Sequence, residues 1–266
     1  AVFGDLDLDG DLDMMVNNHL ATEYPFSAEE GDPNTLYYNN GDGTFEDRTA
    51  LIPAALNSGF SYMSTIVDVT GDFFPDIYIT NDFGSTARPN QLFVNPGLVA
   101  SSYIDRAKEL DVNVSIGGMG LGIGEINGDG VADFLLTNWG PIHLLESIGL
   151  TGWVQTNDAR GIEWKHDEGA YASWATDLQD LDNDGDLDFL AASGELMEPN
   201  GVAANPGDQP DGLFLRDGDV FVESGEAWGM HEDIGNTRGV VIVDLNGDGF
   251  LDMVKRDLRA DAHIWL

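Results

Sequence analysis

The chain has 266 residues and a formal net charge of −37, from 48 Asp and Glu against 11 Lys and Arg, which disfavours nucleic acid and anionic lipid as partners. No apolar run reaches the length of a membrane-spanning helix, so membrane insertion is not expected, and the lack of cysteine excludes disulfides. The 33 glycines and the scarcity of long helical periodicities favour many short strands around a substantial core.

Strand-like runs and acidic loops alternate along the chain five times. The acidic loops occupy residues 5–13, 68–76, 125–133, 180–188 and 244–252. First strands precede the last four loops, at 62–67, 119–123, 174–178 and 239–243. Second strands follow all five loops, at 13–16, 76–80, 133–137, 188–191 and 252–255. Third strands are expected at 36–39, 91–95, 142–145, 213–216 and 262–266.

The first four repeats add a fourth strand, clearest at 44–47 and 220–223. Four antiparallel strands per repeat, with the loops 55 to 64 residues apart, predict an all-β fold. We expect a β-propeller of four-stranded antiparallel blades, with five blades visible in a single domain covering residues 1–266.

Both ends of the chain fall inside a repeat. The chain begins Ala1-Val2-Phe3 with neither a methionine nor a signal sequence, so we expect a processed product, a fragment or the visible part of something longer. The last repeat stops after its third strand. The ring is therefore either a five-blade propeller with an imperfect last blade, or part of a larger ring of six to eight blades. We expect the missing edge, at Ala262–Leu266, to be covered by another chain segment or a partner protein.

The acidic loops have the spacing of a metal site. The fourth loop reads Asp-Leu-Asp-Asn-Asp-Gly-Asp-Leu-Asp over residues 180–188, with acids at its first, third, fifth and ninth positions and glycine at its sixth. Alternate side chains of a tight loop converge, and a hard cation with oxygen ligands must neutralise them, which predicts calcium. An EF-hand is excluded, because the ninth-position aspartate closes the loop and a strand follows at once.

Up to five calcium ions are expected, one in each loop. The predicted ligands are Asp5, Asp7, Asp9, Asp13, Asp68, Thr70, Asp72, Asp76, Glu125, Asn127, Asp129, Asp133, Asp180, Asp182, Asp184, Asp188, Asp244, Asn246, Asp248 and Asp252. The sites should be unequal. The first and fourth loops, with four carboxylates each, should bind most tightly. In the second loop Phe73 replaces the glycine, so it must accept a strained φ or the loop must bend differently.

These motifs resemble a known family. Phe3-Gly4, the five loops and the run Leu-Tyr-Tyr-Asn-Asn-Gly-Asp-Gly-Thr-Phe-Glu-Asp over residues 36–47 look like the FG-GAP/VCBS repeats. Those repeats form the propellers of integrin α-chains and of many secreted bacterial proteins. The runs around Tyr62-Met-Ser and Trp174-Ala-Thr resemble most the branch that includes cartilage acidic protein 1. The resemblance implies a calcium-binding propeller, whereas adhesion modules, lyases and scaffolds all use the fold.

The most consistent function is a secreted, extracellular or periplasmic, calcium-binding scaffold that recognises a protein or a polysaccharide. Residues six places before the loops are expected to line one mouth of the propeller channel, either filling it or touching a ligand: Tyr62, Met119, Trp174 and Arg238.

The alternative is a propeller-fold polysaccharide lyase or hydrolase. It would need a His, a Tyr and an Arg in one cleft, for example His19 and Tyr24 with Arg256 or Arg259. The sequence contains no His-Glu-x-x-His, no Gly-x-Ser-x-Gly and no cysteine, so an enzyme is the less favoured interpretation.

Overall fold

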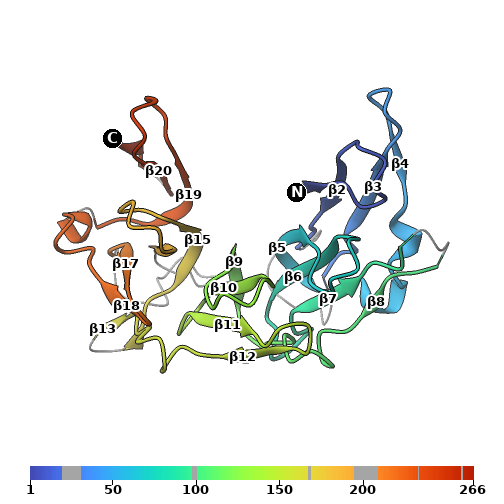
Figure 1. The fold of residues 1–266 in the computed structure, drawn as a ribbon, viewed down its shortest axis with the longest axis horizontal. Helices are drawn as coiled ribbons and strands as arrows, with labels where there is room; N and C mark the ends of the chain where they lie inside the picture. Colours follow the sequence, from blue (N-terminus) through green and yellow to red (C-terminus); the bar gives the residue numbers. More distant parts are fainter. Residues whose placement is uncertain (20–30, 98–100, 167–168, 195–208, 233, 259) are drawn as a thin grey trace, which may run out of the picture. The chain divides into compact units, whose positions relative to one another are not determined.

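The structure is a computed structural model, and it describes residues 1–19, 31–97, 101–166, 169–194, 209–232, 234–258 and 260–266. Strands dominate, and the helices in this part of the chain are three short 3-10 turns, at Thr49–Leu51, Ala54–Leu56 and Met230–Glu232 (Figure 1). Among these residues, no helix is long and apolar enough to cross a membrane.

Each repeat forms one antiparallel sheet whose strands are neighbours in chain order. The first sheet contains β1 (Val2–Gly4), β2 (Asp13–Val16), β3 (Thr35–Asn39) and β4 (Phe45–Asp47). The second contains β5 (Phe60–Val67), β6 (Asp76–Asp82), β7 (Gln91–Val94) and β8 (Ile104–Asp105). The third contains β9 (Gly118–Gly124), β10 (Asp133–Asn138), β11 (His143–Ser147) and β12 (Trp153–Gln155).

The fourth sheet contains β15 (Ser173–Gln179), β16 (Asp188–Ser193), β17 (Gly212–Asp217) and β18 (Val220–Glu223). In the fifth sheet three strands are described, β19 (Thr237–Val243), β20 (Asp252–Asp257) and β21 (Ala262–Trp265). A separate two-stranded hairpin joins β13 (Lys165–His166) to β14 (Gly169–Ala170). The predicted all-β fold of antiparallel propeller blades is confirmed.

Two compact units divide the chain. One comprises residues 1–118, 128–132 and 147–154, and the other comprises residues 119–127, 133–146 and 155–266. In the first unit, the core lies between the first and second sheets: Leu6, Met15, Leu36, Ile52, Ile77, Ile79, Phe93 and Tyr103. In the second unit, one cluster joins the third and fourth sheets around Phe189, Phe214 and Phe221. Another joins the fourth and fifth sheets through Leu190, Leu213, Met230 and Ile242.

One backbone hydrogen bond recurs between successive repeats. A buried aromatic residue at the start of a fourth strand donates its N–H to a carbonyl in the segment that follows the preceding repeat's fourth strand. The pairs are Tyr103 with Leu51 at 2.9 Å, Trp153 with Leu110 at 3.0 Å, and Phe221 with Arg160 at 2.8 Å. Backbone pairing and aromatic packing therefore act together at these three junctions.

Candidate functional site

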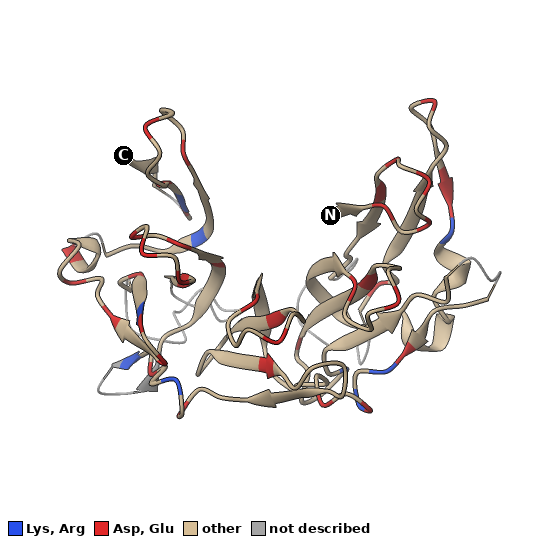
Figure 2. Cartoon of the chain, in the orientation of Figure 1, with Lys and Arg blue, Asp and Glu red and all other residues tan. Residues whose placement is uncertain are grey.

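Each acidic loop connects the first strand of its sheet to the second, so two paired strands hold both of its ends. Figure 2 colours the Asp and Glu positions of the chain red. The sixth position takes a positive φ in every loop, as the bend requires. The φ values are 96° at Gly10, 74° at Phe73, 84° at Gly130, 99° at Gly185 and 89° at Gly249. Phe73 thus accepts the strained φ, one of the two outcomes expected, and its side chain is 82% exposed.

The fourth loop position is also left-handed, which the sequence interpretation missed. The φ values are 62° at Leu8, 75° at Gly71, 82° at Gly128, 62° at Asn183 and 78° at Gly247. The signal was present, because glycine or asparagine, the residues that tolerate this region best, occupies the position in four of the five loops.

The first-position carboxylate folds back over the loop. One of its oxygens accepts the N–H of the sixth residue in four loops. These bonds are Gly10 to Asp5 at 3.1 Å, Phe73 to Asp68 at 2.7 Å, Gly185 to Asp180 at 3.0 Å and Gly249 to Asp244 at 2.9 Å. The side chain is therefore fixed with its oxygens toward the loop interior.

The ninth-position aspartate is buried in all five loops and closes each of them. It accepts the N–H of the second loop residue. The pairs are Leu6 to Asp13 at 2.8 Å, Val69 to Asp76 at 3.1 Å, Ile126 to Asp133 at 2.7 Å, Leu181 to Asp188 at 2.8 Å and Leu245 to Asp252 at 2.8 Å.

In three sheets the other oxygen of this aspartate accepts a backbone N–H at the end of the third strand. The bonds are Asn39 to Asp13 at 2.9 Å, Asn95 to Asp76 at 2.8 Å and Arg216 to Asp188 at 2.7 Å. The residue thus joins three segments of its sheet as well as being a predicted ligand. Each carboxylate oxygen keeps a further lone pair for a cation.

Burial makes the charges of these loops costly. It raises the pKa of Asp76 to about 6 and also raises the pKa of Asp13 and Asp188. The pKa of Asp7 is raised by burial and then by the negative charge of Asp9. A cation would remove these penalties, because an opposite charge favours the ionised carboxylate.

The residues fit a cation with oxygen ligands. In the first loop, oxygens of Asp5, Asp7 and Asp13 lie within 4.8 Å of one another, and a second such cluster joins Asp180, Asp182 and Asp184. Both clusters lie in the loops with four carboxylates. The third position gives independent support. Asp7 Oδ1 and Thr70 Oγ1 occupy this position in two different loops, and both atoms are buried without a hydrogen-bond partner.

The third loop departs from the others at its fifth position. Asp129 accepts hydrogen bonds from Ser147 Oγ at 2.8 Å and from the Gly149 N–H at 2.6 Å. Asn127 Nδ2 donates to Asp133 Oδ1 at 3.3 Å. Three predicted ligands, Asn127, Asp129 and Asp133, are therefore hydrogen-bonded within the protein. Ser147 could not have been foreseen, because it reaches this loop from the end of β11.

The four residues predicted to line a channel mouth have different surroundings. Tyr62 is 39% exposed and its ring lies 5.5 Å from that of His19, whereas Met119 is buried. The guanidinium of Arg238 stacks on Trp174 at 3.8 Å from the ring centre. The structure brings Trp174 and Arg238 together, and a ligand-binding role for the four residues stays a prediction.

The residues proposed for a lyase are only partly described. His19 Nε2 lies 3.4 Å from Asp82 Oδ2, and its ring contacts Phe60 and Phe83 besides Tyr62. Arg256 donates to the backbone carbonyls of Asp257 and Ala260. Tyr24 and Arg259 lie outside the described residues.

The chain is similar to known proteins in sequence and in structure. The chain is 27% identical to cartilage acidic protein 1 of Xenopus tropicalis over 186 residues, which are 67% of this chain and 26% of the relative. The chain thus spans about a quarter of that relative's length.

A solved structure of an Agrocybe aegerita lectin, described as recognising non-reducing terminal N-acetylglucosamine, aligns with a TM-score of 0.49 and 17% identity. The alignment covers 95% of this chain and 59% of that one. The FG-GAP-like repeat family matches residues 5–79 and 180–254, which together exceed half of the chain and contain four of the five acidic loops. The chain belongs to the FG-GAP-like repeat family.

Proposed function

We propose that this protein is a secreted, calcium-binding β-propeller that serves as a scaffold for binding a protein or a polysaccharide. The observation that carries the metal assignment is the unpartnered buried oxygen at the third loop position, on Asp7 and on Thr70. A buried polar atom normally has a partner, since leaving it without one costs free energy. A cation bound in each of these two loops would supply the missing partner.

Calcium fits better than other common metals. The predicted ligands are carboxylate, amide and hydroxyl oxygens, and no loop contains the His or Cys ligands that zinc prefers. Calcium takes six to eight oxygens in a flexible shell, whereas magnesium demands a strict octahedron and keeps its waters. Ligands spread over nine residues suit the flexible coordination shell of calcium better than the strict octahedron of magnesium.

The proposed role in binding a protein or a polysaccharide rests on the rigidity that calcium would give to the sheets. Calcium would hold the loops at one end of each sheet rigid, while the connections at the other end remain available for recognition. Secretion would expose the loops to a medium rich in calcium, which suits sites with oxygen ligands of this kind. The name of the Xenopus tropicalis relative, which refers to an extracellular tissue, also supports it.

Calcium titration by calorimetry tests the proposal, with Asp7→Asn and Asp182→Asn each removing one ligand charge. We expect each variant to lose or weaken one site about tenfold, whereas Asp158→Asn, which alters an exposed carboxylate outside the loops, should bind as the parent does.

The Asp7 variant has a second readout. Without calcium it should melt at a higher temperature than the parent, because a partly buried negative charge near Asp9 is gone. With calcium it should melt at a lower temperature. No measurable calcium uptake by the parent, or identical titrations for all three variants, would refute the metal assignment.

A further inference from the structure

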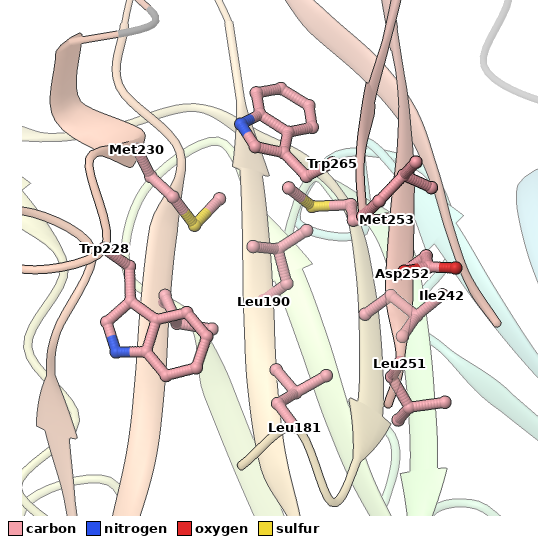
Figure 3. Close-up of a pocket in the computed structure, with 11 residues that line it drawn as sticks. Leu181, Leu190, Trp228, Met230, Ile242, Leu251, Asp252, Met253 and Trp265 are labelled. Carbon is pink, nitrogen blue, oxygen red and sulfur yellow. The ribbon is translucent and has the colours of Figure 1, made fainter. Parts of the chain in front are cut away.

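Charged and polar side chains line a pocket of about 230 Å³ beside the second sheet. It differs in chemistry from the apolar pocket lined by Leu190, Leu213 and Met253 in the other compact unit (Figure 3). We call it the Arg88 pocket, and all of its residues belong to one compact unit. The side chains that determine its chemistry are Arg88, Gln91, Asp105, Lys108 and Asn113.

The Arg88 pocket lies at the end of the second sheet opposite its acidic loop. Arg88 belongs to the connection between β6 and β7, whereas the acidic loop joins β5 to β6. Lys108 and Asn113 belong to the segment that follows β8. The Asn90 N–H donates to the Val114 carbonyl at 3.0 Å and so ties these two walls together. The pocket is therefore at the end that the proposed scaffold leaves available for recognition.

The one acidic side chain of the Arg88 pocket is already used within the protein. Asp105 accepts the N–H groups of Ala107 at 3.0 Å and Leu92 at 3.3 Å, and the Gln91 side-chain amide at 3.1 Å. No ion pair in the described part of the chain joins Asp105 to a cation of the pocket. Its negative charge is thus stabilised by N–H donors of the protein.

The two cations of the pocket, in contrast, have no carboxylate partner among the described residues. Arg88 Nη2 donates to the Ala55 carbonyl at 3.1 Å and to Ser58 Oγ at 3.2 Å, both neutral, and Arg88 Nε is buried without a hydrogen-bond partner. Lys108 is exposed. Elsewhere in this acidic chain carboxylates pair with most of the described Lys and Arg residues: Arg48, Arg106, Arg160, Lys165, Arg216 and Lys255.

Asn113 adds a neutral polar group to the same pocket. It is partly buried, and its side chain makes no hydrogen bond with the described residues. A side-chain amide both donates and accepts hydrogen bonds, as a hydroxyl group does. The pocket therefore offers two positive charges for an anion and one amide for a hydroxyl beside it.

We propose that the Arg88 pocket binds a uronate unit of an acidic polysaccharide, with its carboxylate beside Arg88 and Lys108 and a ring hydroxyl on Asn113. This inference rests on the proposed function and narrows its ligand to a sugar acid. Charge-assisted hydrogen bonds from a guanidinium and an ammonium to a carboxylate are stronger than neutral ones. The pocket has the volume of roughly eight water molecules, at about 30 Å³ each, which leaves room for one sugar unit.

The net charge of −37 does not prevent this binding. At physiological ionic strength the Debye length is about 8 Å, so exposed carboxylates farther away are largely screened. Within the pocket the positive charges of Arg88 and Lys108 outnumber the negative charge of Asp105. The local charge is therefore positive, and a ligand with a single negative charge matches it.

Sodium glucuronate is the probe, and proton–nitrogen NMR spectra of the calcium-loaded chain follow the titration. We expect saturable shifts of the backbone amide signals of Lys108 and Asn113. Three smaller sets of interactions serve as controls. Glucose lacks the charge, acetate lacks the hydroxyls, and N-acetylalanine carries the carboxylate of a peptide C-terminus. Each should bind at least about tenfold more weakly, as expected when a hydrogen bond to a charged group or its neighbours is lost.

Two protein variants test the pocket directly. Lys108→Gln removes an exposed cation that no described ion pair uses, and it should weaken glucuronate binding about tenfold. Asn113→Asp adds a negative charge to the pocket and should abolish binding. Lys165→Gln is the matched control, because it removes another exposed lysine, which pairs with Glu163, and it should bind as the parent does. Circular dichroism of each variant confirms that it is folded.

Binding of glucose as tight as that of glucuronate would overturn the proposal, since the charge would then play no part. Tighter binding of N-acetylalanine would overturn it in favour of a peptide. Titrations left unchanged by Lys108→Gln and Asn113→Asp would place the sugar elsewhere. Calcium calorimetry on the same samples keeps the two proposals separate: calcium uptake without glucuronate binding overturns this inference alone, and lack of calcium uptake refutes the metal assignment whatever the sugar does.

Discussion

At the scale of single residues, the acidic loops depend on two backbone bends that only some side chains tolerate. Leu8 and Phe73 adopt φ values of 62° and 74° although neither is glycine. A left-handed conformation costs an ordinary L-residue roughly 1–2 kcal/mol, and asparagine less. Leu8 is 48% exposed and Phe73 is 82% exposed, so side-chain packing does little to offset this conformational free energy.

Phe73→Asn should therefore raise the free energy of unfolding by about 0.5–1 kcal/mol, because asparagine tolerates the left-handed region. Urea unfolding in the presence of chelator measures the effect without interference from metal. Phe250→Asn is a matched control, since Phe250 is an exposed phenylalanine of the fifth loop whose φ is not positive. A gain of the same size in both variants would show that removing exposed apolar surface, and not relieving strain, is responsible.

The residue scale also shows what sequence reasoning could and could not reach. The sixth-position bend was predictable, because glycine recurs there in four loops and only one residue breaks the pattern. The bonds from Ser147 and Gly149 to Asp129 were not predictable, because they join residues about twenty positions apart through the fold of a whole sheet. The spacing of residues within a loop predicts its conformation, whereas contacts from distant residues decide which side chains stay available to bind a cation.

At the scale of elements, the end of the third strand connects neighbouring loops. Asn95 is the clearest case. Its backbone N–H donates to Asp76, while its side-chain amide donates to the carbonyls of Leu6 in the first loop and Pro75 in the second, at 2.8 and 3.0 Å. One buried side chain therefore ties two acidic loops of the same unit together.

Asn95→Ala should destabilise the protein by about 2–3 kcal/mol, because the buried carbonyl of Leu6 and the partly buried carbonyl of Pro75 lose their donor. Chemical denaturation provides the measurement. Asn40→Ala removes an exposed amide whose side-chain nitrogen bonds Thr44, and should change stability by less than about 0.5 kcal/mol. Equal losses in the two variants would mean that the inter-loop bonds contribute nothing beyond a surface hydrogen bond.

The fourth-strand aromatics offer a second test at this scale. Phe221 lies 5.1 Å from Phe189 in the core, whereas its counterpart Phe45 is 41% exposed. Phe221→Ala should cost about 3–5 kcal/mol, the range for a large buried ring. Phe45→Ala should cost roughly 1 kcal/mol or less. Thermal unfolding of the pair distinguishes a junction-forming aromatic from a surface one, and comparable losses would contradict the junction role.

Strand positions were predictable because each acidic loop marks the register of the two strands beside it. The predicted second strands begin at Asp13, Asp76, Asp133, Asp188 and Asp252, as they do in the structure. The hairpin of β13 and β14 was missed, because its two short strands, Lys165-His166 and Gly169-Ala170, show no apolar alternation. The apolar pocket lined by Leu190, Leu213 and Met253 was beyond prediction, since its walls come from segments separated in the chain.

At the scale of the whole molecule, the dominant feature is the acidic charge. A net charge of −37 destabilises the compact state through self-repulsion, and five calcium ions would offset only ten of those charges. The carboxylates fall into two groups. Those of the loops are held close together and partly buried, whereas many of the others are exposed to solvent, with Glu146, Asp211 and Asp257 as buried exceptions. Salt screens exposed charges strongly and buried ones much less.

Because salt screens exposed and buried charges differently, the melting temperature can distinguish specific calcium binding from screening of surface charge by salt. With chelator present, the melting temperature should fall markedly, because an ion that binds only the folded state stabilises it by mass action. Adding NaCl to about 0.5 M should recover only part of the loss, since salt screens exposed charges strongly but screens the partly buried, clustered loop carboxylates much less. Millimolar calcium should recover all of it, and equimolar magnesium much less, because magnesium accepts a nine-residue loop of this kind poorly. Scanning fluorimetry on one sample series gives the four values. Full recovery by NaCl alone would mean that diffuse surface repulsion, and not the five loops, controls the calcium response.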